Sequence, residues 1–336
     1  YQALKSRDPR FDGLFFVGVT STKIYCRSIC TAKTPLRKNC KFFANHETAE
    51  KNHFRPCLRC RPELAPGHAP IDGAGRIAHL IAERMEGGLY KDGTTIEMVA
   101  KQFALTSRQI RRIIQKEFGV APIELILSRR LLLAKQLLSE TKLPITEIAF
   151  ASGFSSLRRF NDAFLKHYRL PPSRLRQAAA KLTDAVSAES IQLQLHYRPP
   201  YDWNAILTFL QERMIKEVEY VTADCYLRTV RLGKCKGWIK VSHEPTKYAL
   251  KIELAHSLVP VLPAVLMRIR HLFDLNANPQ VINEHLRKQA ILSAGVDHKP
   301  GMRIAGAFDG FEMVVRAVLG QQITVKAATT IARSEE

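Results

Sequence analysis

The segments Ile24-Tyr25-Cys26-Arg27-Ser28-Ile29-Cys30 and Phe54-Arg55-Pro56-Cys57-Leu58-Arg59-Cys60-Arg61 place four cysteines in two close pairs. Three residues separate the cysteines of the first pair, two separate those of the second, and 26 residues lie between the pairs. This spacing is typical of a tetrahedral site in which four thiolates hold one Zn2+. The arginines beside both pairs indicate that the site faces phosphate. The cysteines therefore predict a small module folded around zinc.

A site of this kind can be either chemically reactive or purely structural. Zinc keeps its thiolates deprotonated at neutral pH, and a thiolate is a strong nucleophile towards an alkyl carbon. Most zinc sites with four cysteines are closed and inert, so a purely structural metal is the alternative. Disulfide pairing is a weaker alternative, because the seven cysteines are odd in number and no secretion signal is found. The cysteines thus favour a reducing cytoplasm, and Cys40, Cys225 and Cys235 are predicted to be ordinary small residues.

The charge of the chain indicates a polyanionic partner. Its 336 residues carry a formal net charge of +20. Residues 1–180 contain 31 Lys and Arg against 15 Asp and Glu, whereas the remainder contains 20 against 16. This asymmetry favours double-stranded DNA over a membrane surface, since no long basic amphipathic helix occurs. A basic protein without such a partner is the alternative.

The length suits several domains, and we expect a cytoplasmic, nucleoid-associated protein. No run of eighteen apolar residues occurs, so no membrane span is expected. A chain that begins without Met is expected to be part of a longer protein. The fold class predicted is multidomain. Its segments are a small zinc-stabilised α/β module at 1–66, an all-α double helix-turn-helix at 75–177, an α+β domain at 190–277 and the start of an all-α domain at 278–336.

The zinc module is expected to have a thin core. Residues 15–19 and 23–26 have the pattern of two strands, and 47–53 that of a helix. So small an apolar core predicts that the metal supplies much of the folding free energy. Residues 65–70 are predicted to be a linker.

An internal repeat marks the helical segment. Thr95-Ile96-Glu97-Met98-Val99-Ala100 resembles Pro144-Ile145-Thr146-Glu147-Ile148-Ala149, which lies 49 residues further on. Each copy predicts a short helix, a tight turn and a second helix, and a connecting helix at 125–138 joins the two units. The caps expected for the second helices are Thr106 or Ser107, and Ser155 or Ser156. The faces expected to be buried are Ile110, Ile113, Ile114 and Phe118 in the first unit, and Leu157, Phe160 and Phe164 in the second.

The third segment alternates between strand and helix patterns. Strands are expected at 191–195, 219–232, 236–242 and 249–254. Helices are expected at 201–214 and 261–272. From about residue 278 the pattern is helical again, and this last part is expected to expose an apolar face.

The first segment resembles the N-terminal domain of the Ada family, over about residues 1–65. The resemblance rests on Arg7-Asp8, Asp12-Gly13, Ile24-Tyr25-Cys26-Arg27, Cys30, Phe42-Phe43 and Phe54-Arg55-Pro56-Cys57-x-Arg59-Cys60. That family repairs methyl phosphotriesters in DNA by methylating the first cysteine of the Cys-x3-Cys pair. The resemblance therefore implies that Cys26 is the acceptor and that Cys26, Cys30, Cys57 and Cys60 hold the zinc. The DNA contacts predicted in this segment are Thr22, Arg27, Lys33, Arg55 and Arg59.

Methyl transfer would also change the charge of the zinc site. Methylation of one thiolate leaves one negative charge where there were two. A unit charge about 4 Å from a phosphate is worth about 1 to 4 kcal/mol, depending on the dielectric. The predicted gain in DNA affinity is therefore roughly tenfold or more. The sequence departs from the usual family pattern at Ser28-Ile29, where Pro-Ser is common, and at Lys33, where Arg is common.

The helical segment resembles the AraC-type DNA-binding domain, which implies that its second helices enter DNA grooves. Arg is suited to guanine edges, whereas Gln and Asn are suited to adenine. Solvated or phosphate-bound positions are the alternative for each residue. RNA polymerase is a candidate partner of such a regulator. The candidate contacts are Ser107, Arg108, Gln109, Arg111 and Arg112 in the first unit, and Ser156, Arg158, Arg159 and Asn161 in the second.

The C-terminal part resembles AlkA-type 3-methyladenine DNA glycosylases. The resemblance rests on Tyr197-Arg198-Pro199-Pro200-Tyr201-Asp202-Trp203, Leu272-Phe273-Asp274-Leu275, Asn278-Pro279, Asp309-x-Phe311-Glu312 and Arg316-Ala317-Val318-Leu319-Gly320-Gln321-Gln322. It implies that Gln322 fills the gap left by a flipped base. The helix-hairpin-helix and catalytic Asp of that family are not found. These 336 residues are therefore expected to lack glycosylase activity, and a longer parent is expected to have it.

Three functions follow from these patterns. The first is a DNA alkylation-repair regulator that accepts a methyl group on Cys26, and it is the one we expect. The second is a transcription regulator with inert structural zinc. The third is a glycosylase whose N-terminal modules only target DNA. A Pro-Cys-His-Arg motif, which O6-methylguanine methyltransferases use, does not occur, so that activity is expected to be absent.

Overall fold

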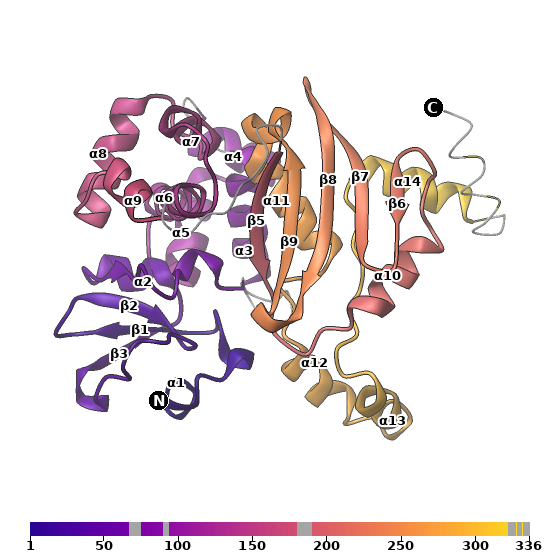
Figure 1. Cartoon of the computed structure of the whole chain (residues 1–336), viewed down its shortest axis with the longest axis horizontal. Coiled ribbons are helices and arrows are strands. Elements are labelled where there is room, and N and C mark those ends of the chain that lie inside the picture. The colour runs from indigo at the N-terminus through magenta and orange to yellow at the C-terminus, as the bar shows by residue number, and fades with distance from the viewer. Residues whose placement is uncertain (67–74, 90–93, 180–189, 322–326, 328–330, 332–336) are drawn as a thin grey trace. The chain divides into compact units, whose positions relative to one another are not determined.

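The computed structural model describes the chain except for residues 67–74, 90–93, 180–189, 322–326, 328–330 and 332–336. It has two units, one built almost entirely from residues before 180 and the other from residues after 189. Figure 1 shows the first in indigo to magenta-pink and the second from rose through orange to yellow. The multidomain fold class is confirmed. The linker predicted at 65–70 falls largely outside the described residues.

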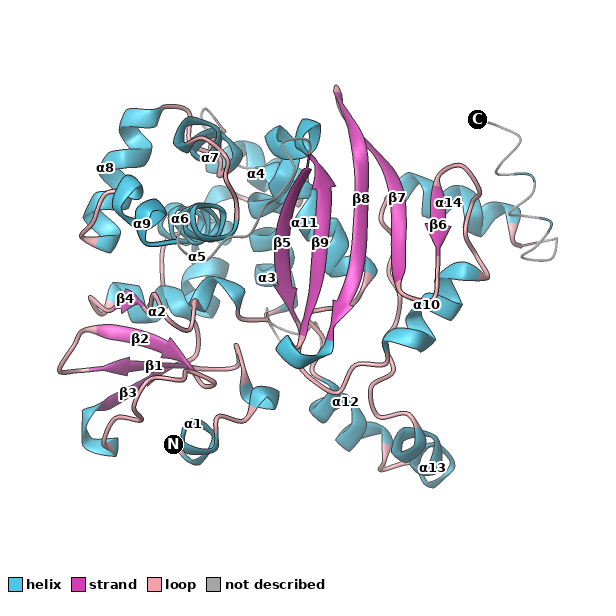
Figure 2. Ribbon diagram, viewed as in Figure 1, coloured by secondary structure: helices cyan, strands magenta, loops and turns pink. Residues whose placement is uncertain are grey.

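A four-stranded sheet forms the zinc module, with the strand order β3-β1-β2-β4 (Figure 2). Strand β1 pairs antiparallel with both β2 and β3, whereas β2 pairs parallel with β4. The two strands and the helix expected from the sequence are present, and two further strands and an N-terminal helix were not expected. The elements are α1 (Gln2–Ser6), β1 (Phe16–Val19), β2 (Ile24–Arg27), β3 (Cys40–Phe43), α2 (His46–Lys51) and β4 (Arg55–Pro56).

The core of this module is small and mostly aromatic. Buried Phe16, Tyr25, Phe43 and Phe54 pack around Ala49 of α2. Gly18 of β1 fits this packing, because a Cβ there would lie 2.7 Å from the ring of Phe43. A core this thin agrees with the expectation that a metal contributes to the stability of the module.

The described residues between 75 and 179 form the α-helices α3 to α9, which make two helix-turn-helix units on the long connecting helix α6, as the repeat predicts. The recognition helices are α5 and α8. Strict periodicity and clear caps made these elements predictable. The helices are α3 (Arg76–Arg84), α4 (Ile96–Gln102), α5 (Ser107–Phe118), α6 (Pro122–Glu140), α7 (Ile145–Ala151), α8 (Leu157–Tyr168) and α9 (Pro172–Ala179).

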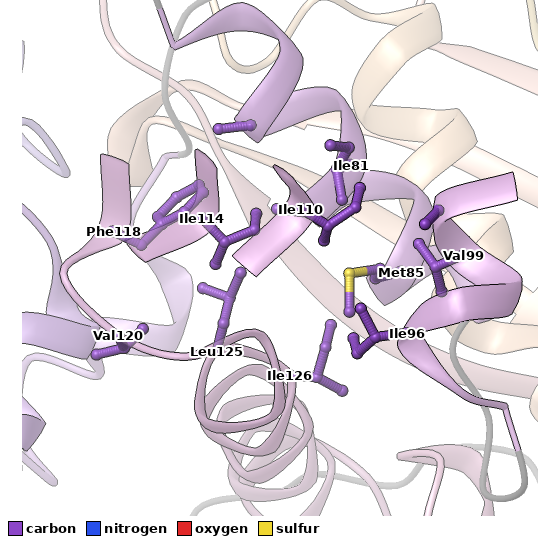
Figure 3. Packing of buried hydrophobic residues seen from close by; sticks show 13 residues of the cluster. Ile81, Met85, Ile96, Val99, Ile110, Ile114, Phe118, Val120, Leu125 and Ile126 are labelled. Carbon is purple, nitrogen blue, oxygen red and sulfur yellow. The ribbon is translucent and has the colours of Figure 1, made fainter. Parts of the chain in front are cut away.

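Capping interactions set where the recognition helices begin and end. Thr106 caps α5, where it forms a capping box with Gln109, and Ser156 caps α8. Gly119 ends α5 with φ 72°, in the left-handed region that favours glycine. Figure 3 shows that the side chains of α3, α4, α5 and α6 converge on one apolar core. The predicted faces are buried at Ile110, Ile114, Phe118, Phe160 and Phe164, and partly buried at Ile113 and Leu157.

A five-stranded antiparallel sheet organises the second unit, in the order β5-β9-β8-β7-β6. The segment 219–232, expected as one strand, is two strands, because residues 222–224 turn the chain and Thr222 bonds back to Cys225. The strands are β5 (Ser190–His196), β6 (Glu219–Val221), β7 (Cys225–Leu232), β8 (Cys235–Glu244) and β9 (Ala249–Ala255). The helices are α10 (Trp203–Gln211), α11 (Leu262–Leu272), α12 (Pro279–Leu286), α13 (Ala290–His298) and α14 (Gly310–Leu319).

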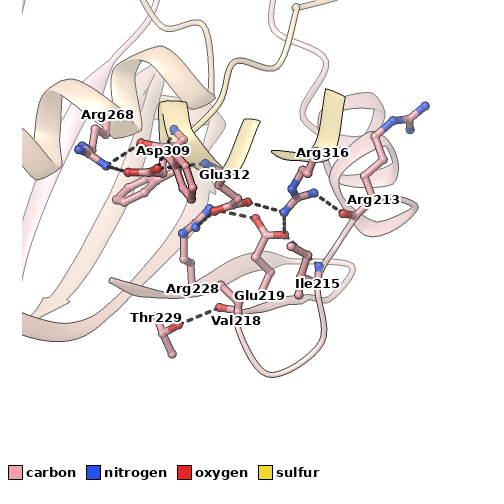
Figure 4. A network of polar contacts seen from close by, with 12 residues as sticks. Arg213, Ile215, Val218, Glu219, Arg228, Thr229, Arg268, Asp309, Glu312 and Arg316 are labelled. Carbon is pink, nitrogen blue, oxygen red and sulfur yellow. Dashed lines mark hydrogen bonds and ion pairs between the residues drawn. The ribbon is translucent and has the colours of Figure 1, made fainter. Parts of the chain in front are cut away.

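Charged side chains attach α14 to strands β6 and β7 of this sheet (Figure 4). Glu219 is only 6% exposed, and it accepts hydrogen bonds from the Tyr226 hydroxyl at 2.6 Å, Arg228 Nη1 at 3.2 Å and Arg316 Nη2 at 3.0 Å. Arg228 and Arg316 also pair with Glu312 of α14. The apolar residues of α14 are instead largely exposed, as expected for this last segment.

The network predicts a large effect of Glu219→Ala on the second unit. The substitution removes a buried partner from Arg228 and Arg316, which should lower the free energy of unfolding by about 3 kcal/mol. Both tryptophans, Trp203 and Trp238, lie in this unit, so tryptophan fluorescence in a denaturant titration reports its unfolding. Asp224→Ala, in an exposed turn, is the control. Equal midpoints for the two variants would show that the network adds no stability.

Candidate metal centre and DNA-facing surface

The four predicted cysteines come together in one cluster. The Sγ atoms of Cys26, Cys30, Cys57 and Cys60 all lie within 4.8 Å of one another. Cys26 lies on β2 and Cys30 in the loop that follows, whereas the second pair follows β4. Since Ile24 pairs with Arg55 and Tyr25 with Pro56, the parallel pairing of β2 and β4 brings the two pairs together.

This donor set fits a single tetrahedral Zn2+. The hydrogen bond with Cys30 is the main cause that raises the pKa of the Cys26 thiol, whereas the hydrogen bond with Cys26 lowers the pKa of Cys57. The thiols therefore compete for protons, and four thiolates this close together need a cation to offset their repulsion. The remaining cysteines, Cys40, Cys225 and Cys235, lie outside the cluster.

Backbone groups hold the sulfurs in place. The Cys57 amide donates to the Tyr25 carbonyl at 2.9 Å, across the β2–β4 pairing. The Arg27 amide donates to Cys60 Sγ at 3.3 Å, and the Arg59 amide donates to Cys57 Sγ at 3.3 Å. Such N–H donors stabilise thiolate charge and orient the sulfurs towards a common centre.

Arg27 is placed differently from the sequence-based expectation. Its residue is 2% exposed, and its guanidinium forms a buried ion pair with Asp12, with Nε 2.9 Å from Oδ1. Its Nη1 also donates to the Cys60 carbonyl at 3.3 Å. Burial and this pairing turn the guanidinium inward, so the expected contact of Arg27 with DNA stays a prediction that this placement does not favour. Arg27 instead positions both cysteine pairs.

The other DNA contacts predicted in the zinc module lie on its surface. Thr22, Lys33 and Arg59 are exposed, and Arg55 is half-buried. Arg59 stands between the second pair of metal ligands, and Thr22 stands in the turn between β1 and β2. Their contact with DNA stays a prediction.

The recognition helices present most of their predicted residues to solvent. Arg108, Arg111 and Arg112 of α5 are exposed, as are Arg158, Arg159 and Asn161 of α8. Arg111 also pairs with Glu97 at 3.4 Å. DNA contact by these residues stays a prediction, and Gln322 lies outside the described residues.

Two of the three candidates at the helix starts act as local caps. Gln109 Oε1 accepts hydrogen bonds from the Thr106 amide at 2.8 Å and from its hydroxyl at 2.9 Å. The Ser156 hydroxyl accepts from the Arg159 amide at 3.2 Å. Ser107 is half-buried at the first position of α5. The Gln109 and Ser156 oxygens are therefore used as caps, which leaves the Gln109 amide nitrogen for an external acceptor.

Sequence reasoning missed two buried charged residues beside the metal site. Asp12 was noted only within a motif, and Lys135 was not noted at all. Lys135 interrupts the apolar run Leu131-Leu132-Leu133-Ala134-Lys135-Gln136-Leu137-Leu138 in α6. A lysine on the buried side of such a helix is rarely left without a partner, so its place in this apolar run could have indicated a buried ion pair.

Within the described parts of the chain, no helix is both long and apolar enough to cross a membrane.

Three family models match consecutive parts of the chain. The metal binding domain of Ada matches residues 1–63. A helix-turn-helix domain matches residues 99–178. The AlkA N-terminal domain matches residues 192–309, and so it runs beyond residue 277 into the helices that follow the sheet.

Several curated proteins are similar to all or part of this chain. A Mycobacterium tuberculosis protein named probable bifunctional transcriptional activator/DNA repair enzyme AlkA is 36% identical over 98% of this chain and 66% of its own length. The Bacillus subtilis bifunctional transcriptional activator/DNA repair enzyme AdaA is 30% identical over 53% of this chain and 81% of its own length. DNA-3-methyladenine glycosylase 2 of Escherichia coli is 36% identical over 41% of this chain and 46% of its own length. The chain thus spans about two thirds of the M. tuberculosis protein.

The position of Asp12 predicts that it supports zinc binding without touching the metal. Asp12→Asn should weaken the ion pair that holds Arg27 against Cys60 and lower the zinc affinity roughly tenfold. Competition with a chelator of known zinc affinity measures this. Asp8→Asn, which alters an exposed pair with Arg10, is the matched control and should leave the affinity unchanged. Equal affinities for the two variants would remove Asp12 from the support of the metal.

Proposed function

This chain belongs to the Ada family and carries an AlkA-type segment, and we propose that Cys26 accepts a methyl group from DNA methyl phosphotriesters. The observation that carries this proposal is the cluster of four sulfurs, with exposed basic side chains on the same module, and the choice of Cys26 among the four rests on the family resemblance. A purely structural site would not need the exposed Arg59 between two ligands.

The proposed reaction is a displacement at the methyl carbon. The Cys26 Sγ thiolate attacks the carbon, an S–C bond forms, and the O–C bond to the phosphotriester breaks. The electron pair of that bond stays on the phosphate oxygen, which restores an anionic phosphodiester. Bound zinc would keep the sulfurs as thiolates at neutral pH. No group in this cluster can remove the methyl from the resulting thioether, so each chain would react once.

The chain's own residues favour this approach in two ways. A phosphotriester has lost the charge of its phosphate, so an anionic sulfur meets less repulsion there than at a normal phosphate. Exposed Arg59 and Lys33 can pair with the flanking phosphates and hold the backbone against the module. Buried Arg27 is given a different role in this proposal, because its guanidinium holds the Cys57–Cys60 segment through the Cys60 carbonyl.

Methylation would then act as a switch on DNA binding. The acceptor sulfur loses its negative charge, so the module repels the DNA backbone less. We propose that the gain appears in promoter binding through α5 and α8, and that the protein activates transcription with RNA polymerase in the cytoplasm, on the nucleoid. We further propose that residues 192–309 belong to a 3-methyladenine-type glycosylase part of the whole protein. Release of 3-methyladenine from alkylated DNA by the whole protein tests that assignment.

Methyl transfer is the first outcome to test. Zinc-loaded protein mixed with a duplex that carries methyl phosphotriesters should gain one methyl group, located on Cys26 by peptide mass spectrometry. Cys26→Ser should gain none. Cys40→Ser is the matched control, since Cys40 lies outside the metal cluster, and it should react like the wild type. Absence of transfer to wild-type protein with zinc and DNA bound would leave a regulator with an inert structural metal.

The charge switch predicts a salt-dependent gain in affinity. Methylated protein should bind a duplex selected from a random pool about tenfold more tightly than unmethylated protein at low salt. The ratio should shrink as salt rises, because screening weakens the repulsion that methylation removes. Fluorescence anisotropy over a salt series measures both constants. Cys26→Ser protein treated with the same methyl donor should show no gain, and a ratio that does not change with salt would contradict an electrostatic switch.

A further inference from the structure

A buried lysine links the metal site to the DNA-binding helices. Lys135 of α6 and Glu63 are each 1% exposed, and Lys135 Nζ lies 2.5 Å from Glu63 Oε2. The same ammonium donates to the carbonyl of the metal ligand Cys57 at 3.0 Å. Helix α6 joins the two helix-turn-helix units, and one of its side chains thus holds the backbone of the candidate zinc ligand Cys57.

A second ion pair lies next to this contact. Arg61 Nε donates to Glu63 Oε1 at 3.0 Å, and Arg61 Nη2 lies 2.9 Å from Glu140 at the end of α6. Glu63 therefore has a cation at each oxygen, and the segment that follows Cys60 is attached to α6 at two points about one helical turn apart.

Helix α2 of the zinc module contacts the C-terminal end of the first recognition helix. Lys51 Nζ donates to the Gly119 carbonyl at 2.8 Å, and the Thr48 hydroxyl donates to the Phe118 carbonyl at 3.2 Å. These are carbonyls that the end of α5 leaves without helical partners. Glu47 of α2 also lies 3.6 Å from Arg129 of α6. Burial alone would raise the pKa of Glu47, but His46 and Arg129 lower it to about 2, so this contact is ionic.

A third connection runs from the strand of Cys26 to the second recognition helix. Tyr25, the neighbour of Cys26 on β2, donates from its hydroxyl to Glu50 Oε1 at 2.8 Å. The same oxygen lies 3.4 Å from His167 Nε2 of α8. The zinc module thus touches α6 and α8 through buried or half-buried polar side chains, and the end of α5 through half-buried Thr48 and exposed Lys51.

The energetics of the buried Lys135–Glu63 pair favour a role in positioning the zinc module over a role in stabilising the fold. Desolvation offsets most of the attraction within a buried ion pair, so well-packed apolar residues would often be as stable or more stable. Such a pair enforces one placement of the two segments that carry its charges, because any other placement leaves a buried charge without a partner. Here the placement enforced is that of the Cys57–Cys60 segment on α6.

We propose that Lys135 is a positioning residue that makes promoter binding respond to the state of Cys26. With Glu63 it fixes the metal site on α6, so that the sulfurs and both recognition helices meet DNA as one body. This inference rests on the proposed methyl acceptance by Cys26. It adds that the gain in DNA affinity after methylation requires the contact of Lys135 with Glu63 and Cys57. A covalent connection between the two modules would not be enough.

A covalent connection between the modules, without fixed contacts, predicts a different response of DNA binding to methylation. Two modules joined by a short flexible segment still bind with a raised effective concentration, but their orientations are averaged over many placements. A charge change at one module then alters only that module's own weak contact. When both modules are fixed, the repulsion at the sulfur acts on the single geometry in which the recognition helices bind.

The test compares two altered proteins with the wild type. Lys135→Met with Glu63→Leu removes both buried charges together, so that neither is left unpaired. Lys142→Met, an exposed lysine just beyond α6, is the matched control. Each zinc-loaded protein is measured for methyl transfer by mass spectrometry. Its affinity for the duplex selected by methylated wild-type protein is then measured before and after transfer.

In the double variant the ratio of methylated to unmethylated affinity should fall at least threefold below that of the wild type. Methyl transfer and zinc content should stay at wild-type levels, and Lys142→Met should match the wild type throughout. An unchanged ratio in the double variant would overturn the proposal, as would an equal weakening of both affinities, which a merely structural role predicts. Failure of wild-type protein to accept a methyl would instead refute the proposed function.

A measurement on wild-type protein covers the case in which the double variant does not fold. Hydrogen exchange is followed along α6 in the zinc-loaded protein and after removal of zinc with a chelator. Fastening through Lys135 predicts that loss of zinc speeds exchange around residues 131–140 several-fold, although α6 supplies no metal ligand. Unchanged exchange there, with exchange increased around Cys57, would overturn the proposal without reference to methyl transfer.

Discussion

Repulsion among four thiolates is the constraint on which the N-terminal part of this protein depends. Sulfurs within 4.8 Å of one another require a cation, and the aromatic core around them is too thin to hold such a cluster by packing. The chain meets this constraint with a two-residue strand. Strand β4 pairs with β2 only at Arg55 and Pro56, yet this pairing aligns one cysteine pair with the other. Buried Arg27, which has Asp12 on one side and the Cys60 carbonyl on the other, then fixes the second pair.

The same residue types act differently on the two sides of this module. Arg27 is buried and shapes the metal site, whereas Arg59 is exposed between two ligands and remains available to phosphate. The side of the module that contacts the helices carries Glu47 and Glu63, which pair with Arg129 and Lys135 of the helical module, and Glu50, which contacts His167. Basic residues on the exposed face and acidic residues at the internal contact explain how so basic a chain packs without self-repulsion. That division also suits the proposed sensor, in which fixed contacts would transmit a change of charge at the metal site.

The second unit uses buried charge for a different purpose. Glu219, Arg228, Glu312 and Arg316 attach α14 to the sheet, while the apolar side chains of that helix stay exposed. The attachment is thus polar and specific in direction, and it does not use the apolar surface of α14. The match of residues 192–309 to the AlkA N-terminal domain joins this sheet to the helices α12 and α13 in a single family unit.

The sequence by itself determined the metal ligands, the double helix-turn-helix and the order of the domains. Cysteine spacing, capping residues such as Thr106 and Ser156, and apolar repeats with a helical period act over a few residues, so they can be recognised without the fold. Strands β3 and β4 could not be recognised, because they are short and become strands only by pairing with β1 and β2. The turn at residues 222–224 was missed because Thr222-Ala223-Asp224 contains no glycine or proline, and so the strand pattern continues through it with little interruption. Only the tertiary structure decided that Arg27 is internal and that Lys135 reaches Cys57 across 78 residues of sequence. The charge of a side chain is written in the sequence, but its partner is decided by which surfaces the fold brings together and closes to water.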